Sequence, residues 1–150
     1  MPETVYFSRH PSLKTLGYAN MRRMKKIENC LCGGHSYETC CGVLHRGGVA
    51  PTAEALMRSR YSAYVLQLEP YLLATWHPTT RPANLGLASE PATQWLGLEI
   101  RHHEQRDETH AIVEFVARYK INGRAHRLHE ISRFVFEDGR WLYLDGEFAQ

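Results

Sequence analysis

The sequence predicts an α+β domain in which helices come first and then cover one face of a curved four-stranded antiparallel sheet. Two observations predict this fold. Apolar side chains recur at helical spacing between residues 51 and 78, whereas after residue 95 they alternate with polar ones. In addition, Asn122-Gly123 and Asp138-Gly139 are dipeptides that favour two-residue hairpin turns, because both turn positions need a positive φ.

Residues 1–28 are predicted to be a basic, poorly ordered leader, with six basic and two acidic side chains. The basic cluster of residues 22–26 is compatible with nucleic-acid binding. A solvated, frayed terminus explains the same charges, so we expect no nucleic acid partner. The chain starts without the basic-then-apolar order of a signal peptide. No apolar run approaches the roughly 20 residues of a membrane span. We therefore expect a cytoplasmic protein with reduced thiols and no membrane partner.

All four cysteines lie in the twelve residues CLCGGHSYETCC, which begin at residue 30. A structural zinc ion needs four thiolate or imidazole ligands in a tetrahedron. Disulfides are disfavoured in the cytoplasm, and one between adjacent cysteines is strained. A redox motif of the Cys-x-x-Cys type is absent. Residues 29–49 are therefore predicted to be a small loop-built module that binds Zn²⁺ through Cys30, Cys32, Cys40 and Cys41.

The first helix of the following domain, residues 50–150, is predicted over residues 51–67. Pro51 opens it and Thr52 is the candidate N-cap. Its apolar stripe contains Arg60, a charge that needs a partner there. A second, shorter helix is predicted over EPYLLATWHP and is ended by Pro78. A further helical turn is expected in TRPANLGLA, residues 80–88.

Four consecutive strands are predicted over residues 95–105, 109–121, 124–137 and 140–148. Since a two-residue turn fixes the register of a hairpin, cross-strand neighbours follow directly from the sequence. Glu130 and Ser132 should lie on the apolar face with Trp141 and Tyr143. Continued from the second turn, the same register places Asp145 opposite Ser132.

Polar groups on a core face need partners. Moving an unpaired carboxylate from water into an apolar core costs on the order of several kcal/mol. One interpretation is a buried ion-pair network that joins Arg60, or else Arg58, to the sheet carboxylates. The other is a polar-floored pocket in the cone between helices and sheet. We favour the network, because structural ion pairs perturb carboxylates as readily as functional sites do. The candidate pocket residues are Arg60, Glu130, Ser132, Trp141, Tyr143 and Asp145.

The segment CLCGG, a tyrosine at residue 37 and the following CCG resemble the SEC-C motif, the small zinc-binding module of the SecA preprotein translocase tail. The loop between the second and third ligands is one residue shorter here than in the commonest form of the motif. His35 is the substitute ligand if one of the four thiolates cannot reach the metal. The resemblance continues through PTAEALMRSRYSAY, YLLATWHPTTRP, ARYK, LHEISRF and GRWLYLDG. Over about residues 29–148 the chain resembles the YchJ-like family of bacterial proteins. That resemblance implies a SEC-C zinc module followed by a cystatin-like cone of the nuclear-transport-factor-two superfamily.

Two functions are compatible with this architecture, since such a fold hosts enzymes and binding modules alike. The first is a zinc-binding interaction or ligand-binding protein. Because SEC-C modules of translocase tails contact a chaperone and the ribosome, the resemblance implies a protein or ribosome-associated partner. The second is a small-molecule enzyme of the dehydratase or isomerase type, with Glu130 or Asp145 as base and Tyr143 as hydrogen-bond donor.

Overall fold

The computed structural model describes residues 29–89 and 92–149. The predicted leader, including its basic cluster, lies outside these described residues. The elements follow in the order η1 (Tyr37–Thr39), α3 (Cys41–His45), α4 (Ala53–Val65), α5 (Glu69–Ala74), η2 (Leu87–Ser89), β1 (Thr93–Gln105), β2 (His110–Ile121), β3 (Arg124–Glu137) and β4 (Arg140–Phe148). In the described part, no helix is long and apolar enough to cross a membrane.

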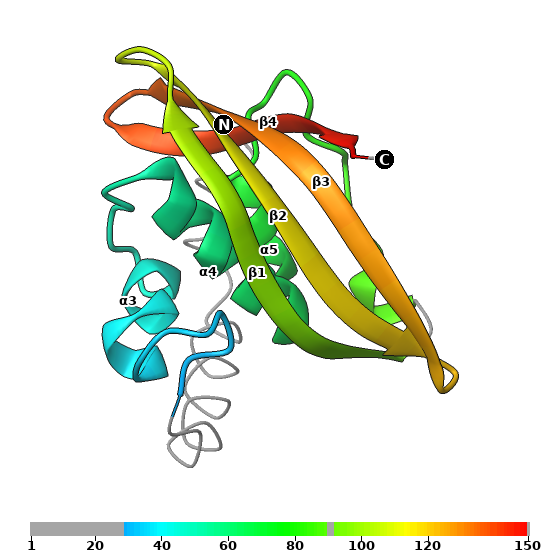
Figure 1. The fold of residues 1–150 in the computed structure, drawn as a ribbon. Coiled ribbons are helices and arrows are strands. Elements are labelled where there is room, and N and C mark those ends of the chain that lie inside the picture. The colour runs from blue at the N-terminus through cyan, green and yellow to red at the C-terminus, as the bar shows by residue number, and fades with distance from the viewer. Residues whose placement is uncertain (1–28, 90–91, 150) are drawn as a thin grey trace.

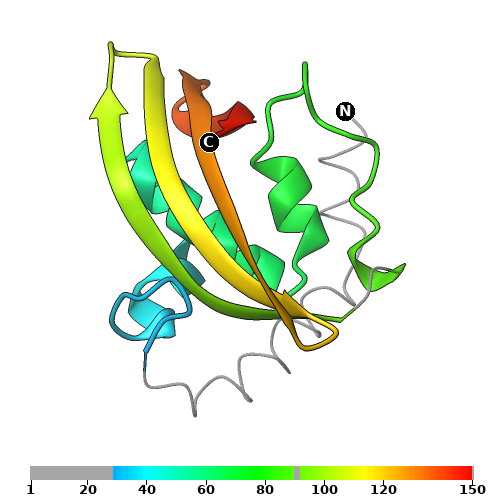
Figure 2. The same cartoon turned by 45° about the vertical axis from the view of Figure 1, so that its right-hand side comes forward.

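The four strands form one antiparallel sheet in the order β1-β2-β3-β4. The sheet is curved, and α4 and α5 both lie on its inner side (Figures 1 and 2). Both predicted turns are present: φ is 53° at Asn122 and 76° at Gly123, and 54° at Asp138 and 80° at Gly139. These values suit the two positions of a type I′ turn. The predicted α+β fold is therefore confirmed.

The predicted register is right for the β2–β3 hairpin and partly wrong for the β3–β4 hairpin. Glu130 pairs with Phe115, as expected. In the second hairpin the pairing shifts between Arg133 and Phe134, so that Ser132 faces Gly146 and Asp145 faces Arg133. One extra residue on β4 makes this bulge, and a shift of one residue moves a side chain to the other face of a sheet. The prediction that Asp145 lies opposite Ser132 is wrong for this reason.

The helices begin as the sequence predicts but end earlier. Thr52 caps α4, since its Oγ1 accepts a hydrogen bond from the amide of Ala55 at 3.0 Å. After α5 the chain runs beside β4: the amide of Tyr143 donates to the carbonyl of Thr75 at 2.8 Å. A bridge between Trp76 and Tyr143 follows. This edge contact ends the helix before Pro78, and the expected turn of residues 80–88 forms only at its end, in η2.

The core joins the cysteine segment to the sheet domain. Leu44 and Ala50, from residues 41–50, belong to the same buried cluster as Leu56 of α4 and Phe134 of β3. A second, smaller cluster contains three of the cysteines and packs against Leu98 of β1. Figure 1 shows α3 beside α4 at the edge of the domain. The module and the sheet domain therefore share a hydrophobic core.

Candidate functional site

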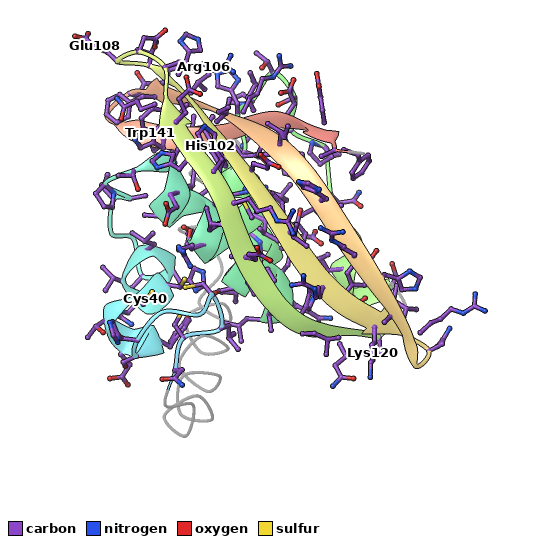
Figure 3. The ribbon with its side chains drawn as sticks, in the orientation of Figure 1. Cys40, His102, Arg106, Glu108, Lys120 and Trp141 are labelled. Carbon is purple, nitrogen blue, oxygen red and sulfur yellow. The ribbon has the colours of Figure 1, made fainter. Side chains whose placement is uncertain are left out.

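The four cysteines form one compact cluster of sulfur atoms. Their Sγ atoms all lie within 4.8 Å of one another, and Cys32 Sγ lies 3.6 Å from Cys40 Sγ. A tetrahedron with metal–sulfur bonds of about 2.3 Å has edges of about 3.8 Å. All four thiols are free, because a disulfide would need sulfurs about 2.05 Å apart. Figure 3 labels Cys40 in the segment that carries α3.

The backbone around the cluster fits a metal. A methyl group added at Gly34 would lie 2.9 Å from Cys40 Sγ and 3.5 Å from Cys32 Sγ, so only glycine leaves room for the sulfurs. Gly33 has a φ of 92°, which lets the chain turn between the two ligand pairs. His35 is exposed and lies outside the cluster. The residues present therefore form a four-sulfur set that needs no imidazole.

The pKa values of the cysteines and the repulsion between their thiolates also favour a bound cation. Burial raises the pKa of Cys40 to about 11. Hydrogen bonding to Cys30 raises the pKa of Cys41, whereas hydrogen bonding from Cys32 lowers that of Cys30. Four thiolates this close repel one another strongly in a buried site. A bound divalent ion offsets that repulsion, and thiolates are the form in which cysteine binds metal.

Helix α4 supplies groups around the cluster that sequence reasoning missed. Ser62, fully buried, donates a hydrogen bond from Oγ to Cys41 Sγ at 3.3 Å. Arg58, one turn earlier, donates to the carbonyl of Cys32 at 3.0 Å and pairs with Glu54. Contacts of this kind orient metal ligands. The only signal in the sequence was a serine on the buried face of a helix.

His45 connects the module to α4 and α5. Burial lowers the pKa of His45, so the ring is neutral at pH 7. Its Nε2 lies 2.8 Å from the carbonyl of Ser59, and that nitrogen must donate. Nδ1 then accepts from the hydroxyl of Tyr37 at 2.6 Å. Tyr71 of α5 completes the chain, since its hydroxyl lies 2.7 Å from Ser59 Oγ.

Gly34→Ala is expected to weaken metal binding by about tenfold or more, the usual effect of disturbing the groups around metal ligands. The new methyl group would displace Cys40 Sγ. Competition with a chromophoric chelator measures the affinity. Glu38→Ala is the matched control, because Glu38 is exposed in the same segment. Equal affinities for Gly34→Ala and the wild type would contradict this role of Gly34.

The second feature is a cavity of about 490 Å³ between the helices and the sheet. It lies in the size range of small-molecule sites. Its wall is mostly apolar, with polar groups from α4 and β3. Among the described residues, seven aromatic side chains line it: Tyr61, Tyr64, Trp76, Trp95, Phe115, Tyr119 and Tyr143. Of the predicted pocket residues, Arg60, Glu130, Ser132 and Tyr143 lie in this wall.

Glu130 is held at the cavity wall by two hydroxyl donors. Its Oε2 accepts hydrogen bonds from Ser132 Oγ and from the Tyr143 hydroxyl, the second at 3.3 Å. The carboxyl group lies over Gly146, where an added methyl would come within 2.6 Å of Glu130 Cδ. Gly146 was missed by sequence reasoning, although a glycine inside a strand is a sign of close approach by another group.

Arg60 is 3% exposed and is held by α5 rather than by a carboxylate. Its Nη1 donates to the carbonyl of Leu72 at 2.8 Å and to Thr75 Oγ1 at 2.7 Å. The guanidinium also lies over two aromatic rings, 5.0 Å from the centroid of Trp76 and 4.6 Å from that of Tyr143. Both contacts are cation–π interactions. The expected ion pair between Arg60 and the sheet carboxylates is therefore replaced by backbone and ring contacts.

Asp145 and Trp141 lie outside the cavity wall. Asp145 forms a two-bond pair with Arg133 at 2.6 and 2.5 Å, because the β4 bulge turns it to the outer face. Figure 3 shows Trp141 near the end of the sheet that carries Glu108, with Lys120 at the other end. The cavity wall includes Tyr119 and Ile121, the neighbours of Lys120 in β2. The predicted network of Arg60, Glu130 and Asp145 is thus absent from the described residues, and Trp141 belongs to the core.

Asp145→Asn is expected to change the free energy of unfolding by less than about 1 kcal/mol, because its pair with Arg133 is exposed. Hydrogen bonding from Arg133 holds the pKa of Asp145 below its ordinary value. The contribution is therefore present at neutral pH and lost as the pH falls through that lowered pKa. Urea unfolding of both proteins at neutral and acid pH measures it. If the variant instead loses several kcal/mol of unfolding free energy at neutral pH, Asp145 belongs to a buried ion-pair network after all.

Comparisons with known proteins agree with this geometry. A SEC-C motif containing protein from Rhodopseudomonas palustris, solved in solution, has a TM-score of 0.73 and 35% identity, over 81% of this chain and 99% of that one. A crystal structure of a SEC-C motif containing protein from Psychrobacter arcticus has a TM-score of 0.59 and 29% identity, over 85% of this chain and 80% of that one.

Relatives of known sequence are more similar still. A UPF0225 protein from Cupriavidus metallidurans is 58% identical over 128 residues, which are 81% of this chain and 89% of the relative. A UPF0225 protein from Ralstonia nicotianae is 59% identical over 131 residues, 80% of this chain and 91% of the relative. The family model described as YchJ, middle NTF2-like domain, matches residues 52–146. As the resemblance predicts, the chain belongs to the YchJ-like family, which also bears the name UPF0225.

Proposed function

We propose that this is a zinc-binding protein whose nuclear-transport-factor-two-like domain binds a small molecule in its cavity. The observation that carries the proposal is the cavity of about 490 Å³, whose described wall combines seven aromatic side chains with two charged ones. Cavities that are mainly apolar with a few convergent polar groups are the usual form of small-ligand sites.

The zinc part of the proposal is supported by the donor set. Four cysteine sulfurs within 4.8 Å favour a soft or borderline metal over calcium or magnesium. Cys30, Cys32, Cys40 and Cys41 would fill all four positions of a tetrahedral ion, so that no position is left for a water or substrate. The metal would therefore contribute free energy of folding and no reaction chemistry. Elemental analysis should find about one zinc per chain.

Binding in the cavity is tested with N-phenyl-1-naphthylamine, an uncharged probe whose fluorescence rises in apolar sites. We expect saturable binding by the full-length, zinc-loaded protein. Leu87→Trp, which adds a bulky ring to the cavity wall, should abolish that binding, whereas Val43→Trp, at an exposed position on α3, should not. Absence of saturable binding by the folded wild type would refute the proposal.

The second candidate is an enzyme of the dehydratase or isomerase type, favoured because Glu130 lies in the cavity wall beside Tyr143. Glu130 would take a proton from a ligand carbon, and Tyr143 would donate a hydrogen bond. Incubation with a metabolite extract in heavy water tests this reaction. Deuterium should enter a metabolite with the wild type and not with Glu130→Gln. Equal labelling with both proteins would exclude Glu130 as the base. A protein or ribosome partner of the cysteine module stays a prediction.

A further inference from the structure

The wall of the cavity carries two opposite charges that are not directly paired. Arg60 uses its Nη1 for Leu72 and Thr75, and the N–H groups on Nε and Nη2 make no hydrogen bond to a described residue. Glu130 receives both of its hydroxyl donors on Oε2, and Oε1 makes no hydrogen bond to a described residue. Each charge therefore keeps free hydrogen-bonding capacity, as donor and acceptor respectively.

Among the described residues that line the cavity, these two carry the only formal charges, and the charges sum to zero. A ligand carboxylate would gain from Arg60 but would be repelled by Glu130. A ligand ammonium would gain from Glu130 but would be repelled by Arg60. Either ligand would also lose part of its hydration on entering the cavity. The wall therefore selects against net charge on the ligand.

An uncharged head group with adjacent donor and acceptor atoms satisfies both side chains. Its acceptor can receive an N–H from Arg60, and its donor can bond to Glu130 Oε1. A wholly apolar ligand would leave the free N–H groups of Arg60 and the Oε1 atom of Glu130 without partners. Each buried polar group left unpaired costs about 1–3 kcal/mol. Primary amides, lactams and the edges of nitrogen heterocycles carry such a pair of atoms.

The remainder of the cavity fits a flat apolar body. Trp95 meets the ring of Tyr61 edge-on, at an interplanar angle of 80°, and the ring of Tyr119 at 46°. Leu85 and Leu87 add aliphatic surface to the same cavity wall. Aromatic side chains contribute large apolar surfaces and prefer offset or edge contacts with a ligand ring.

We propose that the cavity binds an uncharged amphipathic ligand, with a flat apolar body and an amide-like head that bridges Arg60 and Glu130. The inference rests on the proposed function, because it assumes that the cavity is a binding site. It adds the class of ligand and gives each charged side chain a separate role in recognition.

Three probes with one naphthalene body test the head group: 1-naphthaleneacetamide, 1-naphthaleneacetate and 2-(1-naphthyl)ethylamine. Each is titrated calorimetrically into the full-length, zinc-loaded protein near neutral pH. We expect the amide to bind at least about tenfold more tightly than either charged probe. Tightest binding of the acetate or of the amine, or equal binding of all three, would overturn the proposal.

The variant Glu130→Gln tests the role of the negative charge in the cavity wall separately from that of Arg60. Glu130→Gln removes the repulsion of the acetate while keeping the shape of the side chain, so the preference for amide over acetate should fall about tenfold or more. Glu114→Gln, whose carboxylate pairs with His129 instead, is the control and should keep that preference. An unchanged preference in folded Glu130→Gln would overturn the role of Glu130, and the wild-type order of the probes decides even if the variant does not fold.

The failure of this inference can be told apart from failure of the proposed function. Should N-phenyl-1-naphthylamine bind while the three probes show another order, only the ligand class is wrong. If no probe binds and N-phenyl-1-naphthylamine does not either, the cavity is not a binding site and both proposals fall together.

Discussion

Removal of the metal is expected to lower the melting temperature of the whole protein by about 10 °C or more. At this chain length such a shift corresponds to about 3–5 kcal/mol. A free energy of this size is within reach of a structural metal site, because binding free energies of such sites are larger still. The sequence alone instead predicts residues 29–49 as a module and residues 50–150 as a following domain.

The expectation of a joint effect follows from the contacts of the module. Leu44 lies in the main core, and His45 bonds to the carbonyl of Ser59 in the middle of α4. Ser62 of α4 donates to Cys41 Sγ. When the metal leaves, the four thiols lose their common centre, and these buried groups of α4 lose partners. Unsatisfied buried groups are costly, so the effect extends into the sheet domain.

Tryptophan fluorescence measures the effect on the sheet domain alone. The three tryptophans, Trp76, Trp95 and Trp141, all lie outside residues 29–49. Melting is followed with and without a strong chelator, and in the double variant Cys32→Ser/Cys40→Ser. Re-addition of zinc should restore the wild-type midpoint but not that of the variant. A tryptophan midpoint unchanged by the chelator would show that the sheet domain is independent of the metal.

What could be predicted from the sequence was local. The cap at Thr52 and the two hairpin turns depend on a few neighbouring residues, and the structure has all of them. The cysteine cluster was also predictable, because twelve consecutive residues contain all four cysteines. In each case the residues that determine the feature lie close together along the chain.

What could not be predicted depends on tertiary contacts. The turn at Asp138-Gly139 fixes the register only until the bulge, which reverses the side on which Asp145 lies. A bulge has no dipeptide signature, although Gly146 next to it makes room for Glu130. The partners of Arg60 were missed for a similar reason. Arg60 contacts a backbone carbonyl group and the faces of two aromatic rings. Such partners carry no formal charge, so a search for oppositely charged residues in the sequence does not find them.

Arg60→Ala is expected to destabilise the protein by about 3–5 kcal/mol, because it removes two hydrogen bonds from a charged donor, each worth about 1.5–3 kcal/mol, and two cation–π contacts. The carbonyl of Leu72 and the hydroxyl of Thr75 would both lose a charged donor. The faces of Trp76 and Tyr143 would lose the guanidinium between them. The melting temperature should therefore fall by about 10 °C.

Two further variants separate packing from charge at this position. Arg60→Met restores much of the lost volume and apolar contact, so it should recover part of the stability but none of the amide binding. Arg60→Lys should not substitute for arginine, because an ammonium cannot lie flat on two rings while donating to Leu72 and Thr75.

Arg133→Ala provides the matched control, since Arg133 forms an exposed two-bond pair with Asp145 and should cost less than about 1 kcal/mol. Should Arg60→Ala melt within about 3 °C of the wild type, the guanidinium would not be needed to hold α4, α5 and β4 together. Its burial would then serve only the ligand. If instead Arg60→Ala and Arg60→Met are equally destabilised, the charge and its hydrogen bonds, rather than the volume of the side chain, stabilise this side of the cavity.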